Sequence, residues 1–371
     1  MQRIRILIIS PKNKTVYNFR GDLIKDMIAA GNEVYVTGPN RLFYDEVMSL
    51  GIKVFIEIPL VKDNTNPFGD MKYLKELKKC IRKLKPDLVF SYTIKPVIYG
   101  SLAASSAGVG KIYSMVTGLG RVYSTGSAKA KLVRKITITL YRRALKKCSK
   151  VIFQNPDDRE ALIKLNCVKR ENTELVNGSG VNMDRFARGK TPEKLSFLMV
   201  SRIIREKGVL DYCAAAKKVK EKYPEVRFVM LGGFDESIGK LSRADVAEYI
   251  DGGIVEFPGE VKDPIEYYGG CSVYVLPSYY REGLPRTILE AMSCGRPVIT
   301  TDWPGCREPI IDGENGILVP VNDPDALADA MIRFIVEDGL LERLSDSAYE
   351  TCKEKYEVSI VNKQMRKILK Y

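Results

Sequence analysis

The chain of 371 residues contains no histidine. Histidine is the usual general base near neutral pH, so any proton transfer here must use carboxylates, hydroxyls, lysine, arginine or backbone groups. The eight cysteines include no Cys-x-x-Cys pair. Together these two absences exclude zinc sites built on Cys/His clusters, and they predict reduced, mostly buried thiols.

Long apolar runs are also absent. No stretch approaches the roughly 18 uninterrupted apolar residues that a membrane-spanning helix needs. In residues 3–7 arginine alternates with isoleucine, which is typical of a first β-strand and not of a signal peptide. We therefore expect a cytoplasmic protein. We expect no metal site, because the single Asp-x-Asp, at Asp323 and Asp325, precedes a predicted helix and is explained by capping.

Acidic residues are missing from residues 88–156, whereas the same stretch holds twelve Lys and Arg. Residues 1–190 contain 35 Lys and Arg against 16 Asp and Glu, and residues 191–371 contain 24 against 30. The first part therefore carries +19 and the second −6 of the total charge of +13. This asymmetry predicts that the first half faces nucleic acid, an anionic membrane surface or a diphosphate-bearing substrate.

Short apolar or β-branched runs alternate with helical patterns in both halves. This alternation predicts the α/β class, with a doubly wound parallel sheet in each of two domains. The expected strands are 4–10, 33–37, 53–58, 88–91, 112–116 and 151–154, then 195–201, 226–232, 254–257, 272–277 and 297–301. A glycine-rich hinge at 177–190 separates a first domain, 1–185, from a second, 190–355. A final helix, 356–371, is expected to pack back on the first domain. Ligands should bind in the cleft between the facing domains, at the carboxyl ends of the strands.

The sharpest motif is residues 281–291, which follow a predicted strand and open a helix. A helix N-terminus offers free N–H groups for phosphate oxygens. Glu282 is expected in the loop and Glu290 about two turns into the helix, where they would accept hydrogen bonds from hydroxyls. Alone, such acidic residues are usually caps or dipole partners. Arg202 and Lys207, after the first strand of this half, add two cations that favour a diphosphate ligand.

Taken together, these motifs resemble retaining glycosyltransferase family 4, with the two-Rossmann GT-B fold, over nearly the whole chain. The resemblance implies a UDP-sugar donor, no metal or other cofactor, and catalysis by Arg202, Lys207 and Glu282. Arg202 and Lys207 would bind the diphosphate, Glu290 the ribose, and Glu282 the transferred sugar. The remaining donor-binding positions implied are Gly232, Gly233, Val261, Gly283, Leu284 and Pro285.

The first half resembles a narrower group that extends sugars on polyprenyl diphosphate, including N-acetylgalactosaminyltransferases. The motifs are residues 90–96, 99–100 and 116–120. Acceptor-binding residues implied are Lys95, Thr117, Gly118, Arg121 and Asn18. Lys95 is either a ligand of the acceptor diphosphate or an ordinary surface lysine. Thr117 stands where many members carry histidine, so we expect no side-chain base there. The loop at 11–18 lacks the family's glycine pair, so we expect the donor–acceptor boundary to differ there in detail.

The predicted function is retaining transfer of a hexose or N-acetylhexosamine from a UDP-sugar to a polyprenyl-diphosphate-linked saccharide, in bacterial glycan, O-antigen or capsule assembly. Among the possible sugars, GalNAc is favoured. A UDP-sugar epimerase of similar fold and a non-enzymatic polyanion-binding protein remain alternatives. The basic segments 71–85 and 131–147 either lie on the inner face of the membrane or are ordinary helices with a solvated face. Nucleic acid is not an expected partner.

Overall fold

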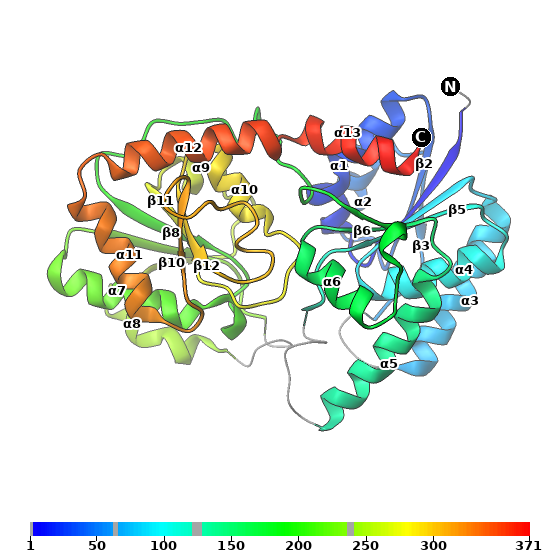
Figure 1. Cartoon of the computed structure of the whole chain (residues 1–371), viewed down its shortest axis with the longest axis horizontal. Coiled ribbons are helices and arrows are strands. Elements are labelled where there is room, and N and C mark those ends of the chain that lie inside the picture. The colour runs from blue at the N-terminus through cyan, green and yellow to red at the C-terminus, as the bar shows by residue number, and fades with distance from the viewer. Residues whose placement is uncertain (1–2, 62–65, 121–127, 236–240) are drawn as a thin grey trace. The chain divides into compact units, whose positions relative to one another are not determined.

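The computed structural model describes residues 3–61, 66–120, 128–235 and 241–371 (Figure 1). It divides into two compact units, Met1–Ser179 with Val361–Tyr371, and Gly180–Ile360. Each unit has one parallel sheet with helices on both faces, so the predicted α/β class is confirmed.

The sheet of the first unit has the order β3-β2-β1-β4-β5-β6-β7. Its strands are β1 (Arg5–Ile9), β2 (Glu33–Gly38), β3 (Val54–Glu57), β4 (Leu88–Tyr92), β5 (Lys111–Val116), β6 (Lys150–Phe153) and β7 (Thr173–Leu175). Chain order changes direction at β1, which lies between β2 and β4. In doubly wound sheets, ligands bind at the carboxyl ends of the strands at such a switch point.

Alternate residues of the central strands pack into two separate apolar cores, one on each face of the sheet. Ile6 and Ile8 of β1 pack in the core beneath α1 (Asn13–Ala29), α2 (Tyr44–Met48) and the end of α13 (Val358–Leu369). Leu7 and Ile9 pack in the opposite core. That second layer consists of α3 (Pro67–Leu84), η1 (Pro96–Gly100), α4 (Ser101–Ser106), α5 (Ala128–Leu145) and α6 (Pro156–Lys164). Burial on both faces explains why the central strands read as unbroken apolar runs.

The sheet of the second unit has the order β10-β9-β8-β11-β12-β13. The strands are β8 (Ser196–Val200), β9 (Arg227–Leu231), β10 (Glu256–Gly259), β11 (Val273–Leu276), β12 (Val298–Thr301) and β13 (Gly316–Val319). The helices are η4 (Arg205–Lys207), α7 (Val209–Lys222), η5 (Arg243–Val246), α8 (Ala247–Asp251), α9 (Ile265–Gly269), α10 (Arg286–Ser293), α11 (Pro324–Val336) and α12 (Leu340–Lys355). Here the switch point lies between β8 and β11.

The boundary between the units comes earlier than residue 185, where we expected the first domain to end. Val181 exchanges backbone hydrogen bonds of 2.9 Å with Tyr356 and Val358. Val181 and Phe186 are also buried in the core of the second unit. These contacts assign residues 180–189 to the second unit, although their glycines and charges are typical of a linker.

The residues of the final helix, α13, are divided between the two units. Its first residues, up to Ile360, belong to the second unit, and residues from Val361 onward belong to the first. Arg366 and the Tyr371 hydroxyl each lie 2.7 Å from the carboxylate of Asp26 on α1. The end of the chain is therefore attached to the first helix of the first unit.

Helix α1 begins at Asn13, whereas we expected a loop over 11–18. The buried side of its first turns carries Asn13, Val16 and Arg20. The Asn13 amide donates hydrogen bonds of 2.8 and 2.6 Å to the carbonyl oxygens of Asn40 and Leu42. Because two of these three buried residues are polar, the apolar periodicity that reveals a helix is missing.

The expected thiols and helix cap are confirmed. All eight cysteines are free and seven are buried. The Asp323 carboxylate accepts a 2.9 Å hydrogen bond from the Ala326 N–H at the start of α11, as predicted for a cap. Within the described ranges, no helix is both long and apolar enough to cross a membrane.

Candidate functional site

Two loops meet at the switch point of the second unit. Lys207 ends η4, which follows β8, and Glu282 lies in the loop between β11 and α10. The two side chains form an ion pair between Lys207 Nζ and Glu282 Oε1. Lys207 is only 6% exposed, and lysine is rarely buried to this degree unless its charge is paired. The structure therefore brings together two residues that the sequence assigned to one ligand.

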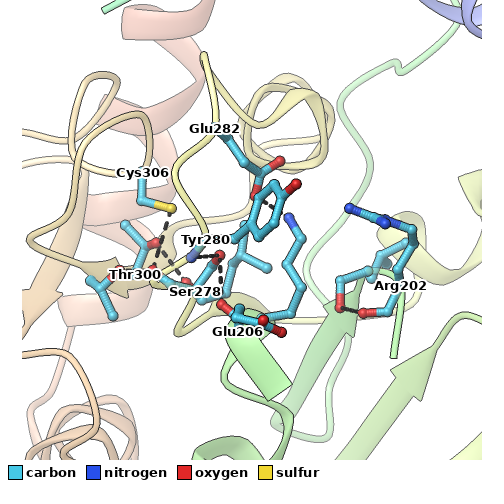
Figure 2. Close-up of polar contacts among 12 residues, drawn as sticks. Arg202, Glu206, Ser278, Tyr280, Glu282, Thr300 and Cys306 are labelled. Carbon is cyan, nitrogen blue, oxygen red and sulfur yellow. Dashed lines mark hydrogen bonds and ion pairs between the residues drawn. The ribbon is translucent and has the colours of Figure 1, made fainter. Parts of the chain in front are cut away.

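Arg202, two residues after the end of β8, lies near Glu282 (Figure 2). Its Nη1 is 3.0 Å from Asp235 Oδ2, and its Cζ is 5.6 Å from the centre of the Tyr280 ring. A cation at this distance from an aromatic ring is stabilised by the ring quadrupole. The Arg202 side chain is 41% exposed, so its charge is oriented by the protein and still accessible to an anion.

Ser278 is the centre of a hydrogen-bond network beneath the site (Figure 2). Its hydroxyl donates to the Glu206 carbonyl oxygen at 3.3 Å and accepts from the Tyr280 N–H at 3.2 Å. Its own carbonyl oxygen accepts from the Thr301 hydroxyl and, at 3.7 Å, from the Cys306 thiol. Burial raises the pKa of Cys306 to about 12, so this thiol is protonated at neutral pH. The network joins the loops after β8, β11 and β12.

Sequence reasoning missed this network. Its members are short polar residues at the ends of buried strands, and Ser278 and Thr301 have no exposed surface. Buried hydroxyls are normally hydrogen-bonded, so polar residues that end apolar runs were the available signal. Their partners are backbone carbonyls of distant segments, which leave no residue pattern.

Packing within the protein gives its own reason for glycine at 232, one of the two glycines implied as donor-binding positions. A Cβ on Gly232 would lie 1.7 Å from the carbonyl oxygen of Ser201, in a backbone with φ of 145°. A Cβ on Gly233 would lie 3.0 Å from a carboxylate oxygen of Glu260. The protein itself therefore requires glycine at 232, because the loop after β8 lies against it.

Glu290 lies about one turn into α10, not two, because the helix begins at Arg286 and Pro285 is extended at its N-cap. The Glu290 carboxylate is 3.2 Å from Arg286 Nε and accepts a 3.0 Å hydrogen bond from the Tyr268 hydroxyl. Burial raises the pKa of Glu290, and the charge of Arg286 opposes this shift. A carboxylate accepts up to about four hydrogen bonds, so it retains capacity for ligand hydroxyls.

The other predicted donor residues follow the same sheet edge. Leu284 is buried, and Glu282, Gly283 and Pro285 complete the short segment before α10. Val261 follows β10 and packs partly against the core of the second unit. The carboxyl ends of β8, β9, β10 and β11 thus carry all the residues assigned to the donor.

Lys95 is not an exposed surface lysine. It follows β4 by three residues and stands immediately before η1. Its Nζ lies 2.7 Å from Asp70 Oδ1 and 2.7 Å from the Val61 carbonyl oxygen, and its side chain is 15% exposed. Asp70 also accepts a 3.0 Å hydrogen bond from the Tyr99 hydroxyl. Asp70 therefore holds both Lys95 and Tyr99 at the carboxyl end of the first sheet.

The other acceptor candidates are distributed along the same edge. Thr117 and Gly118 follow β5, which pairs with β4, and Gly118 has a φ of 110° that favours glycine. Asn18 lies half-buried in the second turn of α1. Arg121 lies outside the described residues.

A buried polar cluster marks the switch point of the first sheet. The Tyr92 hydroxyl, at the end of β4, lies 2.7 Å from the Ser10 hydroxyl and 3.1 Å from that of Thr15. The Arg20 guanidinium lies 5.0 Å from the centre of the Tyr92 ring. Burial raises the pKa of Tyr92, so the phenol stays neutral. Residue spacing alone did not reveal this cluster.

Two doubly wound units, with a cation and a carboxylate paired at the switch point of the second sheet, define a two-domain Rossmann-like protein. Residues 181–351 match the family model for glycosyl transferases group 1, and residues 5–155 match that for glycosyl transferase 4-like domains. The chain therefore belongs to the glycosyltransferases, with a 4-like domain in its first half and a group 1 domain in its second.

Two relatives extend along most of the chain. The N,N'-diacetylbacillosaminyl-diphospho-undecaprenol alpha-1,3-N-acetylgalactosaminyltransferase of Campylobacter jejuni is 27% identical, and the match covers 98% of both chains. The UDP-Gal:alpha-D-GlcNAc-diphosphoundecaprenol alpha-1,3-galactosyltransferase of Escherichia coli is 28% identical, over 83% of this chain and 80% of the relative.

Solved structures establish the fold. Anabaena HepE in complex with UDP-glucose superimposes with a TM-score of 0.80 at 18% identity, over 99% of this chain and 100% of HepE. Sucrose-phosphate synthase from Thermosynechococcus elongatus superimposes with a TM-score of 0.79 at 22% identity, over 99% of this chain and 98% of the synthase chain. The chain has the GT-B fold.

Proposed function

We propose that the chain is a retaining, metal-independent glycosyltransferase of the inner membrane face. It transfers a hexose or N-acetylhexosamine from a UDP-sugar to a saccharide on polyprenyl diphosphate. Among these sugars we favour GalNAc. The observation that carries the donor half of this proposal is the buried Lys207–Glu282 pair beside Arg202. The names of the Campylobacter and Escherichia relatives support the acceptor half.

The donor diphosphate is bound by Arg202 and Lys207. In the free protein Glu282 is the counter-ion of Lys207. The diphosphate takes over that role, which leaves the Glu282 carboxylate available to the hydroxyls of the sugar. Glu290 accepts hydrogen bonds from the ribose. Negative charge grows on the diphosphate as the sugar leaves, so both cations stabilise the transition state more than the ground state.

Transfer needs no side-chain base. The bond between the anomeric carbon and the donor phosphate breaks, and the acceptor oxygen bonds to the same face of that carbon. The acceptor's proton passes to the leaving phosphate oxygen. This route suits a chain that has no histidine and that carries Thr117 at the acceptor side.

The proposal is tested with a panel of UDP-sugars against polyprenyl-diphosphate-linked saccharides, with and without EDTA. We expect one donor to give an α-linked product, identified by NMR, at a rate that EDTA leaves unchanged. A β-linked product from an α-linked donor would contradict retention. Hydrolysis or 2-epimerisation of the UDP-sugar without any transfer would contradict the proposed function.

The Lys95→Met variant should raise the KM for the lipid-linked acceptor by at least roughly tenfold, because a charge-assisted contact to the diphosphate is lost. UDP binding, in the other unit, should not change. Asp70→Asn is the matched control, since it breaks the same ion pair but keeps the lysine charge. If both variants raise the acceptor KM equally, the role of Lys95 is to support the fold around η1.

A further inference from the structure

Four large apolar side chains are exposed at the beginnings of two helices in the first unit. Phe68 and Met71, in the first turns of α3, are 88% and 62% exposed. Leu132 and Ile136, in the first half of α5, are 59% and 52% exposed. Single exposed apolar residues are ordinary, but a group of them on neighbouring elements marks an interaction surface.

Both helix beginnings lie at the same end of the unit. Helix α3 joins β3 to β4, and α5 joins β5 to β6, and all these strands are parallel. A helix that connects parallel strands runs antiparallel to them, so it begins at the carboxyl edge of the sheet. Both helices belong to the same layer, where they pack against η1 (Figure 1). We call the four apolar residues the apolar tips.

Cations continue from the apolar tips along the exposed sides of both helices. In α3 the inner side is formed by Tyr73, Leu77 and Ile81, which are buried. The solvent side carries four exposed cations at helical spacing from Phe68: Lys72, Lys75, Lys79 and Arg82. From residue 131 onward, the exposed cations of α5 are Lys131, Lys135, Arg142 and Arg143. Each helix therefore combines exposed apolar residues in its first half with a basic face.

We propose that the apolar tips and these basic faces dock the first unit on an anionic lipid bilayer. The apolar tips enter the headgroup region, and the cations bind lipid phosphates. Nucleic acid fits this surface less well, because a phosphate backbone attracts the cations but gives the four apolar side chains no apolar environment.

The docking surface adjoins the candidate acceptor site. Asp70, which binds Lys95, is the direct neighbour of Met71 in α3. A bilayer bound to the apolar tips therefore lies at the edge of the sheet that carries Lys95. The biological reason for docking rests on the proposed function, since a polyprenyl-linked acceptor would enter from that bilayer. The docking itself is testable without any transfer.

The experiment is co-sedimentation of the full chain with vesicles of phosphatidylglycerol and phosphatidylcholine, compared with phosphatidylcholine alone. The wild type should bind only the anionic vesicles. Combined replacement of Phe68, Met71, Leu132 and Ile136 by alanine should weaken partitioning by at least about tenfold. Combined Lys75→Ala and Lys79→Ala should weaken it by roughly tenfold, with the remaining binding less sensitive to salt.

The matched control combines Leu42→Ala and Val336→Ala, two apolar residues that are 70% and 56% exposed outside the docking surface. This control should bind vesicles as the wild type does. Thermal unfolding with and without UDP verifies that every variant is folded. Equal binding to neutral vesicles, or equal losses in the control and the apolar-tip variant, would overturn the proposal. Vesicle binding as predicted, but with no transfer to a detergent-solubilised acceptor, would support docking and contradict the proposed function.

Discussion

Lys207→Ala should lower kcat/KM for the donor by about 10²–10³-fold and remove most of the thermal stabilisation by UDP. The substitution deletes a buried charge that the proposed mechanism places on the leaving diphosphate, and one lost electrostatic contact in a catalytic site costs about this much. UDP at 100 times its Kd stabilises a native protein by about 2.7 kcal/mol, which is a shift of several degrees. The measurement is thermal unfolding of wild type and variant over a UDP titration, followed by steady-state transfer kinetics.

Lys218→Ala is the matched control. Lys218 forms an ion pair with Asp325 in the same unit, but the two side chains are 46% and 72% exposed. Exposed pairs contribute little to stability, so this variant should keep the UDP shift and the transfer rate. If UDP stabilised Lys207→Ala as strongly as the wild type, the assignment of Lys207 to the diphosphate would be wrong.

The Glu282→Gln variant tests the role of Glu282 independently of that of Lys207. Lys207 would lose its counter-ion while remaining buried, so the variant without ligand should melt at a lower temperature. UDP would then supply the missing negative charge, and the shift on UDP binding should be larger than in the wild type. Transfer should nevertheless fall, because the carboxylate assigned to the sugar is gone. A smaller UDP shift would instead place Glu282 among the groups that bind the nucleotide.

The central strands of both units could be predicted from the sequence for a simple physical reason. Parallel strands covered on both faces are continuous apolar runs, as in residues 6–9 and 273–276. The short strands β7 and β13 were missed, because one consists of Thr-Glu-Leu and the other begins with glycine. The beginning of α1 was missed because Asn13 and Arg20 take buried positions that are usually apolar.

The candidate site could be predicted as a set of residues, but its internal contacts could not. Motif spacing placed Lys207 and Glu282 in one half, at strand ends. Their direct pairing depends on β8 and β11 being neighbours in the sheet, which local pattern does not reveal. The same limit applies to Lys95, whose partner Asp70 lies in another helix. Contacts that involve backbone carbonyls, such as those of Ser278, have no residue signature at all.

The loop after β12 makes one more backbone contact that the sequence did not predict. Gly305 has a φ of 91°, and a Cβ added there would lie 2.6 Å from the Glu282 carbonyl oxygen and 2.8 Å from that of Gly283. Carbon and oxygen atoms cannot approach this closely, so any side chain must displace the segment of Glu282 and Gly283, to which we assign sugar binding. Gly305 thus positions the donor loop without carrying a functional group.

Gly305→Ala should therefore lower kcat/KM by about 10²-fold, since displacements near 1 Å in a catalytic site have effects of this size. Gly313→Ala is the matched control. Gly313 also has a positive φ, 76°, but nothing lies within 4 Å of its added Cβ. Both variants incur the backbone strain of about 1–2 kcal/mol, and only Gly305→Ala moves the loop. Transfer kinetics and unfolding of both variants measure the two effects separately. Equal kinetic losses in the two would mean that strain alone, and not contact with Glu282 and Gly283, accounts for the glycine at 305.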